Sequence, residues 1–162
     1  MNRKKLILCL WFILGLMLMA SLAACAGAPK VDWEVRVTGE VTTPLTLSFS
    51  DLVGMDQVKL KDIFMERTYG EDETRTFEGV ALSDLLSKAG ASPDYVSITA
   101  LAADGYAIEI TRDEMEGGIL ALIDGGEWII KKEPDSGPLR LVFPKTPANR
   151  WVYQLEEIQV NK

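Results

Sequence analysis

The most informative segment of this sequence for its architecture is Phe77-Glu78-Gly79-Val80-Ala81-Leu82-Ser83-Asp84-Leu85-Leu86, which contains the start of the clearest helix in the chain. Leu82, Leu85, Leu86 and Ala89 follow the spacing i, i+3, i+4 and i+7, and this spacing predicts a helix with one apolar face. Gly90 is placed to end that helix, because glycine adopts the left-handed conformation without steric cost.

Short segments with a period of two surround this helix and predict strands. The dipeptide Asp104-Gly105 predicts a tight hairpin, and Ser50 is expected to cap a short helix that starts at Asp51. Strands outnumber helices, so we predict an α+β fold that is rich in antiparallel sheet and has short helices. The predicted strands cover residues 33–38, 45–48, 58–68, 74–77, 95–103, 106–110, 119–123, 139–143 and 151–160.

The N-terminus has the pattern of a secretory signal. Basic residues at positions 3–5 precede an apolar run from Leu6 to Ala20, and small residues follow it. The run is shorter than the ~20 residues of a stable membrane span. We therefore predict a signal peptide over residues 1–24, and we keep an uncleaved N-terminal anchor as the alternative.

The end of this signal, Leu22-Ala23-Ala24-Cys25, resembles the lipobox of bacterial lipoproteins. The resemblance implies cleavage before Cys25 and a diacylglycerol thioether on its sulfur, with residues 25–32 as lipidated cysteine and tether. The rest of the chain is then expected outside the cytoplasm, anchored to the bacterial cell membrane. In a cell with two membranes Ala26, which stands where some lipoproteins carry a retention aspartate, favours the outer membrane.

The charge balance narrows the range of partners. The chain has 17 Lys+Arg, 24 Asp+Glu and no histidine, and its formal net charge is -7. Removal of the predicted signal takes away three basic residues and no acidic one, which leaves -10. Such a surface repels nucleic acid, so we expect no nucleic-acid partner, and membrane attachment is expected to come from the lipid. The lack of histidine excludes Ser/His/Asp triads and histidine metal sites.

Four segments, taken in order, resemble one family. They are Phe77 to Leu86, Ala103-Asp104-Gly105-Tyr106, Gly137-Pro138-Leu139-Arg140-Leu141-Val142-Phe143-Pro144, and Arg150-Trp151-Val152 with a closing strand to Val160. Together they resemble the molybdopterin-binding domain of the sulfite oxidase family in its small single-domain form. The resemblance implies a sheet-rich fold over residues 33–162 with a pocket for a pterin pyrophosphate that carries molybdenum.

The sequence departs from that family at the metal ligand. In active members a cysteine just after the strand that precedes the Phe77 motif ligates molybdenum, whereas this chain reads Phe64-Met65-Glu66-Arg67 there. Neither Met65 nor Glu66 supplies the anionic sulfur that the metal requires. Molybdopterin therefore stays a possible cofactor, but redox catalysis is not expected.

The few basic residues near the C-terminus are the candidates for binding an anion. The resemblance implies that the basic residue just before the tryptophan, Arg150, helps to hold the anionic part of the cofactor, and an arginine fork suits pyrophosphate oxygens. The alternative for Arg140 is a surface ion pair, because it alternates with Leu139 and Leu141 along a strand. The candidate cofactor-binding residues are Arg150, Asn149, Arg140, Lys145, Arg67 and Tyr69.

Three functions are compatible with these features. The first is a membrane-anchored, non-catalytic domain that binds a pterin or another small anion. The second is a molybdenum-dependent oxidoreductase with altered metal ligation, and the third is an interaction module of a membrane redox or transport complex that binds no ligand. The sequence identifies no protein partner.

Overall fold

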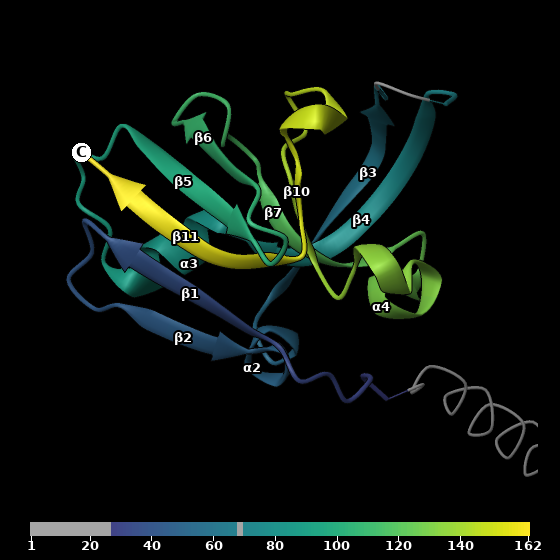
Figure 1. The fold of residues 1–162 in the computed structure, drawn as a ribbon, viewed down its shortest axis with the longest axis horizontal. Helices are drawn as coiled ribbons and strands as arrows, with labels where there is room; N and C mark the ends of the chain where they lie inside the picture. The colour runs from purple at the N-terminus through teal and green to yellow at the C-terminus, as the bar shows by residue number, and fades with distance from the viewer. Residues whose placement is uncertain (1–26, 68–69) are drawn as a thin grey trace, which may run out of the picture.

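Two sheets make up most of the structure, a computed structural model that describes residues 27–67 and 70–162 (Figure 1). The first sheet has the strand order β2-β1-β11-β5-β6 and the second has the order β10-β9-β7-β4-β3, with β8 paired to β7. All pairs are antiparallel except β1 with β11. The predicted α+β architecture is confirmed. The predicted signal peptide, the lipidation site Cys25 and the candidate residue Tyr69 lie outside the described residues.

The strands alternate with short helices along the chain. The elements are β1 (Glu34–Gly39), β2 (Leu45–Ser48), α2 (Phe49–Val53), β3 (Gln57–Met65), β4 (Glu73–Ala81), α3 (Leu82–Ala89), β5 (Ser97–Ala102), β6 (Ala107–Thr111), β7 (Ile119–Asp124), β8 (Glu127–Trp128), α4 (Ile129–Lys132), η1 (Pro134–Ser136), β9 (Arg140–Val142), η2 (Ala148–Arg150), β10 (Val152–Tyr153) and β11 (Leu155–Asn161).

Strand β4 runs directly into helix α3, as the sequence pattern predicts. Leu82, Leu85, Leu86 and Ala89 are buried, and Gly90 ends the helix with φ 65°. Helix α3 contacts both β1 and β4, so its apolar face packs against elements of both sheets. Gly79 lets β4 and β7 approach closely, because a Cβ on it would lie 2.0 Å from the Leu120 carbonyl oxygen.

Aromatic packing fixes the strands around the C-terminal part of the core. The rings of Phe77 and Trp151 meet edge to face, with centroids 5.6 Å apart. The Trp151 indole Nε1 donates a hydrogen bond of 3.1 Å to the Phe143 carbonyl oxygen. Trp151 is therefore a core residue, and its buried N–H has a partner.

Two local predictions are wrong. The cap of α2 is Ser48 and not Ser50, because Ser48 and Asp51 satisfy each other's backbone N–H groups in a capping box. The predicted strand over residues 151–160 is divided at Gln154, which has φ 49° and donates its backbone N–H to the Leu139 carbonyl oxygen. This residue lets the chain leave the second sheet after β10 and enter the first sheet as β11.

Candidate functional site

The end of β3 and the loop before Trp151 lie side by side. The Ala148 backbone N–H in η2 donates a hydrogen bond of 3.1 Å to the Glu66 carbonyl oxygen, directly after β3 ends. Met65, the last residue of β3, is buried, with 3% of its surface exposed. The two segments that the resemblance singled out for metal and anion binding are thus neighbours.

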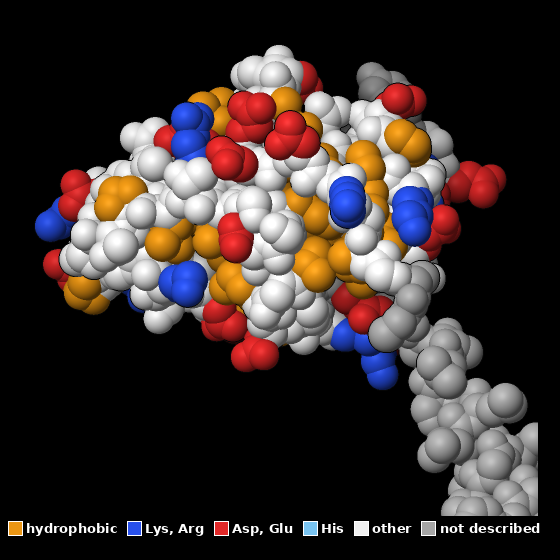
Figure 2. Space-filling view, turned by 90° about the horizontal axis from the view of Figure 1, so that it is seen from below, with side chains coloured by type: hydrophobic (Ala, Val, Ile, Leu, Met, Phe, Trp, Pro, Cys, Tyr) orange, Lys and Arg blue, Asp and Glu red, His pale blue; other side chains and the backbone are white. Residues whose placement is uncertain are grey.

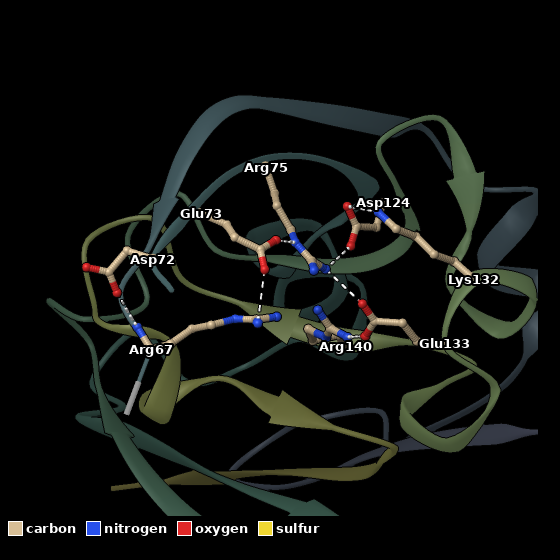
Figure 3. A network of polar contacts seen from close by, with 8 residues as sticks. All are labelled: Arg67, Asp72, Glu73, Arg75, Asp124, Lys132, Glu133 and Arg140. Carbon is tan, nitrogen blue, oxygen red and sulfur yellow. Dashed lines mark hydrogen bonds and ion pairs between the residues drawn. The ribbon is translucent and has the colours of Figure 1, made fainter. Parts of the chain in front are cut away.

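Figure 3 shows a continuous network of charged side chains that starts beside this contact. Arg67 pairs with Glu73 at 3.0 Å, and Glu73 pairs with Arg75 at 2.7 Å. Arg75 in turn donates to Asp124 at 2.6 Å and to Glu133 at 2.9 Å. Basic and acidic side chains occur in equal numbers in the network, so its formal charge is balanced.

Arg140 forms the buried end of this network. Its Nη2 donates a hydrogen bond of 2.6 Å to Glu133, and its guanidinium carbon lies 3.9 Å from the centroid of the Tyr153 ring. The predicted ion pair exists, but the expectation that Arg140 lies on the surface is wrong, because its exposed fraction is 0%. Strand β9 has no solvent-exposed face, because all three of its residues are buried. The alternation of Arg140 with Leu139 and Leu141 therefore does not place Arg140 on the surface.

Two side chains of the network, Arg140 and Asp124, have buried polar atoms without a hydrogen-bond partner in the described part of the chain. Among the described residues, the Nε and Nη1 of Arg140 are buried without a hydrogen-bond partner. The Oδ1 of Asp124 also lacks a hydrogen bond, although the Lys132 ammonium lies 3.1 Å away. Buried donors on a charged group are normally satisfied, so these two nitrogens of Arg140 are the donors available to a small anion.

Arg150 points to a different part of the molecule. It pairs with Glu114 at 2.8 Å and donates to the Glu109 carbonyl oxygen at 2.8 Å. Hydrogen bonds from Thr111 and the nearby Arg150 charge hold the pKa of Glu114 below its ordinary value, despite the opposing effect of burial. Arg67 and Arg140 are therefore linked through shared carboxylates, whereas Arg150 binds a carboxylate outside that network.

The remaining two predicted residues lie on the surface of the same loop as Arg150. Lys145 is exposed and pairs with Glu116, and Asn149 is exposed in η2. Neither is brought to Arg140 by an interaction in the structure. The backbone of the predicted binding loop thus contacts the end of β3. Its basic side chains, in contrast, form ion pairs with acidic residues outside the network.

Four further residues of the network were not predicted from the sequence: Glu73, Arg75, Asp124 and Glu133. The sequence of the strand that contains Phe77 gives one indication of this network. Side chains two residues apart lie on the same face of a strand, so Arg75 and Glu73 share a face with the buried Phe77. A charged side chain on a core face requires a partner, and this requirement predicts an ion pair there.

Glu133 in this network makes stability depend on pH. Burial alone would raise the pKa of Glu133, but hydrogen bonds from Arg75 and Arg140 outweigh it, and the pKa lies below its ordinary value. A carboxylate with a lowered pKa in the folded state stabilises the fold above its unfolded-state pKa, and this contribution is lost as the pH falls through the folded-state pKa.

We expect the free energy of unfolding to decrease from about pH 5 downward, and to do so less steeply when Glu133 is replaced by glutamine. Urea unfolding at a series of pH values measures both slopes. Glu127→Gln, at an exposed position in β8, is the matched control and is expected to keep the wild-type slope. Identical slopes for wild type and Glu133→Gln would contradict the prediction.

The described residues do not supply a conventional metal site. Within residues 27–67 and 70–162, no group of three or more histidine, cysteine, aspartate or glutamate side chains is arranged to hold a metal ion. Over the same part of the chain, every helix is too short or too polar to cross a membrane.

Comparisons with known proteins agree with this architecture. The model of the oxidoreductase molybdopterin binding domain family matches residues 25–162. An uncharacterized oxidoreductase of Bacillus subtilis (strain 168), YuiH, is 29% identical over 115 residues, which cover 69% of this chain and 57% of that protein.

A solved structure extends the comparison to the fold. The crystal structure of the sulfane dehydrogenase SoxCD from Paracoccus pantotrophus superimposes with a TM-score of 0.72 at 24% identity, over 84% of this chain and 40% of that one. The chain thus spans little more than half of the YuiH sequence and less than half of the SoxCD chain. Since the family model covers nearly the whole chain, and the two sheets match this solved fold, the chain belongs to the oxidoreductase molybdopterin-binding domain family.

Proposed function

We propose that this protein is a lipid-anchored, extracytoplasmic member of the family that does not catalyse molybdenum chemistry and retains, at Arg140, the capacity to bind a pterin or another small anion. The observation that supports this proposal most strongly is the burial and incomplete hydrogen bonding of the Arg140 guanidinium. Its guanidinium is fully buried and donates to Glu133 through Nη2, and its Nε and Nη1 are buried without a hydrogen-bond partner among the described residues.

The proposed lack of catalysis is supported by the donors at the end of β3. The sequence contains no cysteine after Cys25, and β3 ends at Met65 followed by Glu66. A neutral thioether and a hard carboxylate do not replace a thiolate as a ligand for molybdenum. The residues present therefore do not fit the metal of the family's cofactor.

The charge balance of the network limits what could bind beside it. Arg67, Arg75 and Arg140 already have carboxylate partners from the same chain. A pyrophosphate would have to compete with those carboxylates, whereas one small anionic group could accept hydrogen bonds from the unpartnered Nε and Nη1 of Arg140 without breaking an ion pair. This difference favours a small anion over a complete molybdenum cofactor.

An oxidoreductase is the second candidate function. YuiH bears the word oxidoreductase in its name, and SoxCD is described as a sulfane dehydrogenase. A catalytic role here would require metal ligation without a cysteine thiolate. An interaction module without a ligand is the third possibility and would use neither the metal nor these two nitrogens of Arg140.

Cofactor analysis of the purified protein distinguishes these functions. The full-length chain is produced in a host that makes molybdopterin, extracted in detergent, and analysed for released pterin and for molybdenum. We expect pterin without stoichiometric metal if the protein keeps the organic part of the cofactor. Stoichiometric metal would contradict the non-catalytic proposal. Absence of both would favour a different small anion or an interaction role, which phosphate or sulfate titration of wild type against Arg140→Met then separates.

A further inference from the structure

The segment between the predicted lipidation site and the first strand lies beside helix α2. Val31 and Trp33 pack on the hydrophobic core, and the Phe49 backbone N–H at the start of α2 donates to the Trp33 carbonyl oxygen at 2.9 Å. A hollow of about 540 Å³ separates the segment from the helix. It is lined by Ala28, Pro29, Lys30, Val31, Asp32, Phe49, Ser50 and Val53.

This packing leaves a very short free connection to Cys25. Residues from Ala28 onward already line the hollow at α2, so only three Cα-to-Cα steps separate the helix-contacting segment from Cys25. Three extended steps span about 11 Å. The polar layer of a bilayer is itself about 6 Å deep on each side of the hydrocarbon core. If the chain is attached to the membrane at Cys25, the connecting segment is too short to let α2 lie far from the bilayer surface.

The surface around α2 is suited to this position. Figure 2 views the molecule from below Figure 1, and it shows hydrophobic side chains on this face with both basic and acidic side chains among them. Val31 and Val53 are half-buried and Lys30 is exposed. Phe49 links this region to Trp128, with ring centroids 6.0 Å apart. Half-exposed apolar side chains with an adjacent lysine are typical of residues at a lipid interface.

The end of β3 and the η2 loop lie at the other end of the domain. In Figure 1, α2 is at the bottom, whereas η2 and the end of β3 are at the top. The ion pair of Arg150 with Glu114 places the turn after β6 beside η2. A bilayer next to α2 would therefore leave the end of β3 and the η2 loop facing away from the lipid.

We propose that the face formed by residues 28–32 and α2 lies directly on the bilayer surface and orients the domain so that the end of β3 and the η2 loop point into the aqueous compartment. The occupant of this face is the lipid headgroup layer. The proposal rests on the proposed attachment through Cys25, and it adds an orientation that attachment alone does not specify.

Site-specific fluorescence in proteoliposomes tests this orientation. The full-length chain with Cys9→Ser receives one further cysteine for a polarity-sensitive dye, either Ser50→Cys in α2 or, as the matched control, Asp113→Cys in the turn after β6. Both positions are exposed. The vesicles contain phosphatidylcholine with and without a lipid that carries a quencher at the headgroup. We expect several-fold stronger quenching and a blue-shifted emission for the dye at residue 50.

The outcomes separate orientation from attachment. Equal quenching at the two positions, or stronger quenching at residue 113, with the protein still bound to the vesicles would overturn the proposed orientation and leave the attachment intact. Cys25→Ser in the same background is expected to release the protein from the vesicles. If Cys25→Ser stays bound as wild type does, or if wild type does not bind, the attachment at Cys25 and the orientation that depends on it both fail.

Discussion

Replacing Glu133 with alanine is expected to lower the free energy of unfolding by about 3–5 kcal/mol, the usual effect of removing one partner from a buried ion pair. Glu133 accepts hydrogen bonds from Arg75 and from Arg140, at 2.9 and 2.6 Å. Arg75 keeps Glu73 and Asp124 when Glu133 is lost, but Arg140 keeps no carboxylate that pairs with it in the structure. Its charge would then be buried under the Tyr153 ring without compensation. Urea denaturation measures the change.

A second substitution shows whether the buried charge is the cause. Arg140→Met keeps much of the side-chain volume and removes the charge, so the double variant Glu133→Ala/Arg140→Met is expected to recover most of the lost stability. Glu127→Ala, at an exposed position, is the matched control and is expected to stay within about 0.5 kcal/mol of wild type. A Glu133→Ala variant as stable as this control would contradict the structural role of the network.

Replacing Gly79 with alanine is expected to cost at least about 3 kcal/mol, or to prevent folding, because overpacking against backbone atoms cannot be relieved by a rotamer change. A Cβ at this position would lie 2.0 Å from the Leu120 carbonyl oxygen and 2.6 Å from the Ala121 Cα. Gly79 also lies at the register shift between β4 and β7. The new methyl group would force apart the two strands from which α3 and the charged network are positioned.

Gly54→Ala is the matched control for this change. A Cβ at Gly54 would make an ordinary contact of 3.5 Å with the Asp51 carbonyl oxygen, and the backbone of Gly54 is already right-handed. Thermal unfolding followed by circular dichroism is expected to show little change for Gly54→Ala and a large loss for Gly79→Ala. Similar melting temperatures for the two variants would mean that β4 and β7 can separate without cost.

The elements set by local sequence were predictable. The spacing of Leu82, Leu85 and Leu86 and the position of Gly90 depend only on helical periodicity and capping, and the helix occurs where they place it. Asp104-Gly105 forms the turn between β5 and β6, with Gly105 at φ 87°, because this dipeptide favours the conformation that such a turn needs.

Features that depend on tertiary packing were not predictable in the same way. Gln154 adopts φ 49° because the chain changes sheets there, and nothing in the alternation of residues 151–160 marks that change. Arg140 is buried because β9 is covered on both faces, whereas a single alternating strand predicts one solvated face. The partners Glu73, Asp124 and Glu133 come from separate segments, so only the fold identifies them as a site.

The molybdenum content of the purified protein tests the proposed loss of catalysis most directly. The full-length chain and YuiH are produced in the same molybdopterin-making host, and metal per chain is measured for both, with YuiH reporting whether that host loads a relative. We expect only trace molybdenum in this protein when YuiH is loaded, because the sequence offers no cysteine thiolate after Cys25. Stoichiometric molybdenum in this protein would contradict the proposal and would establish a metal site built without that ligand.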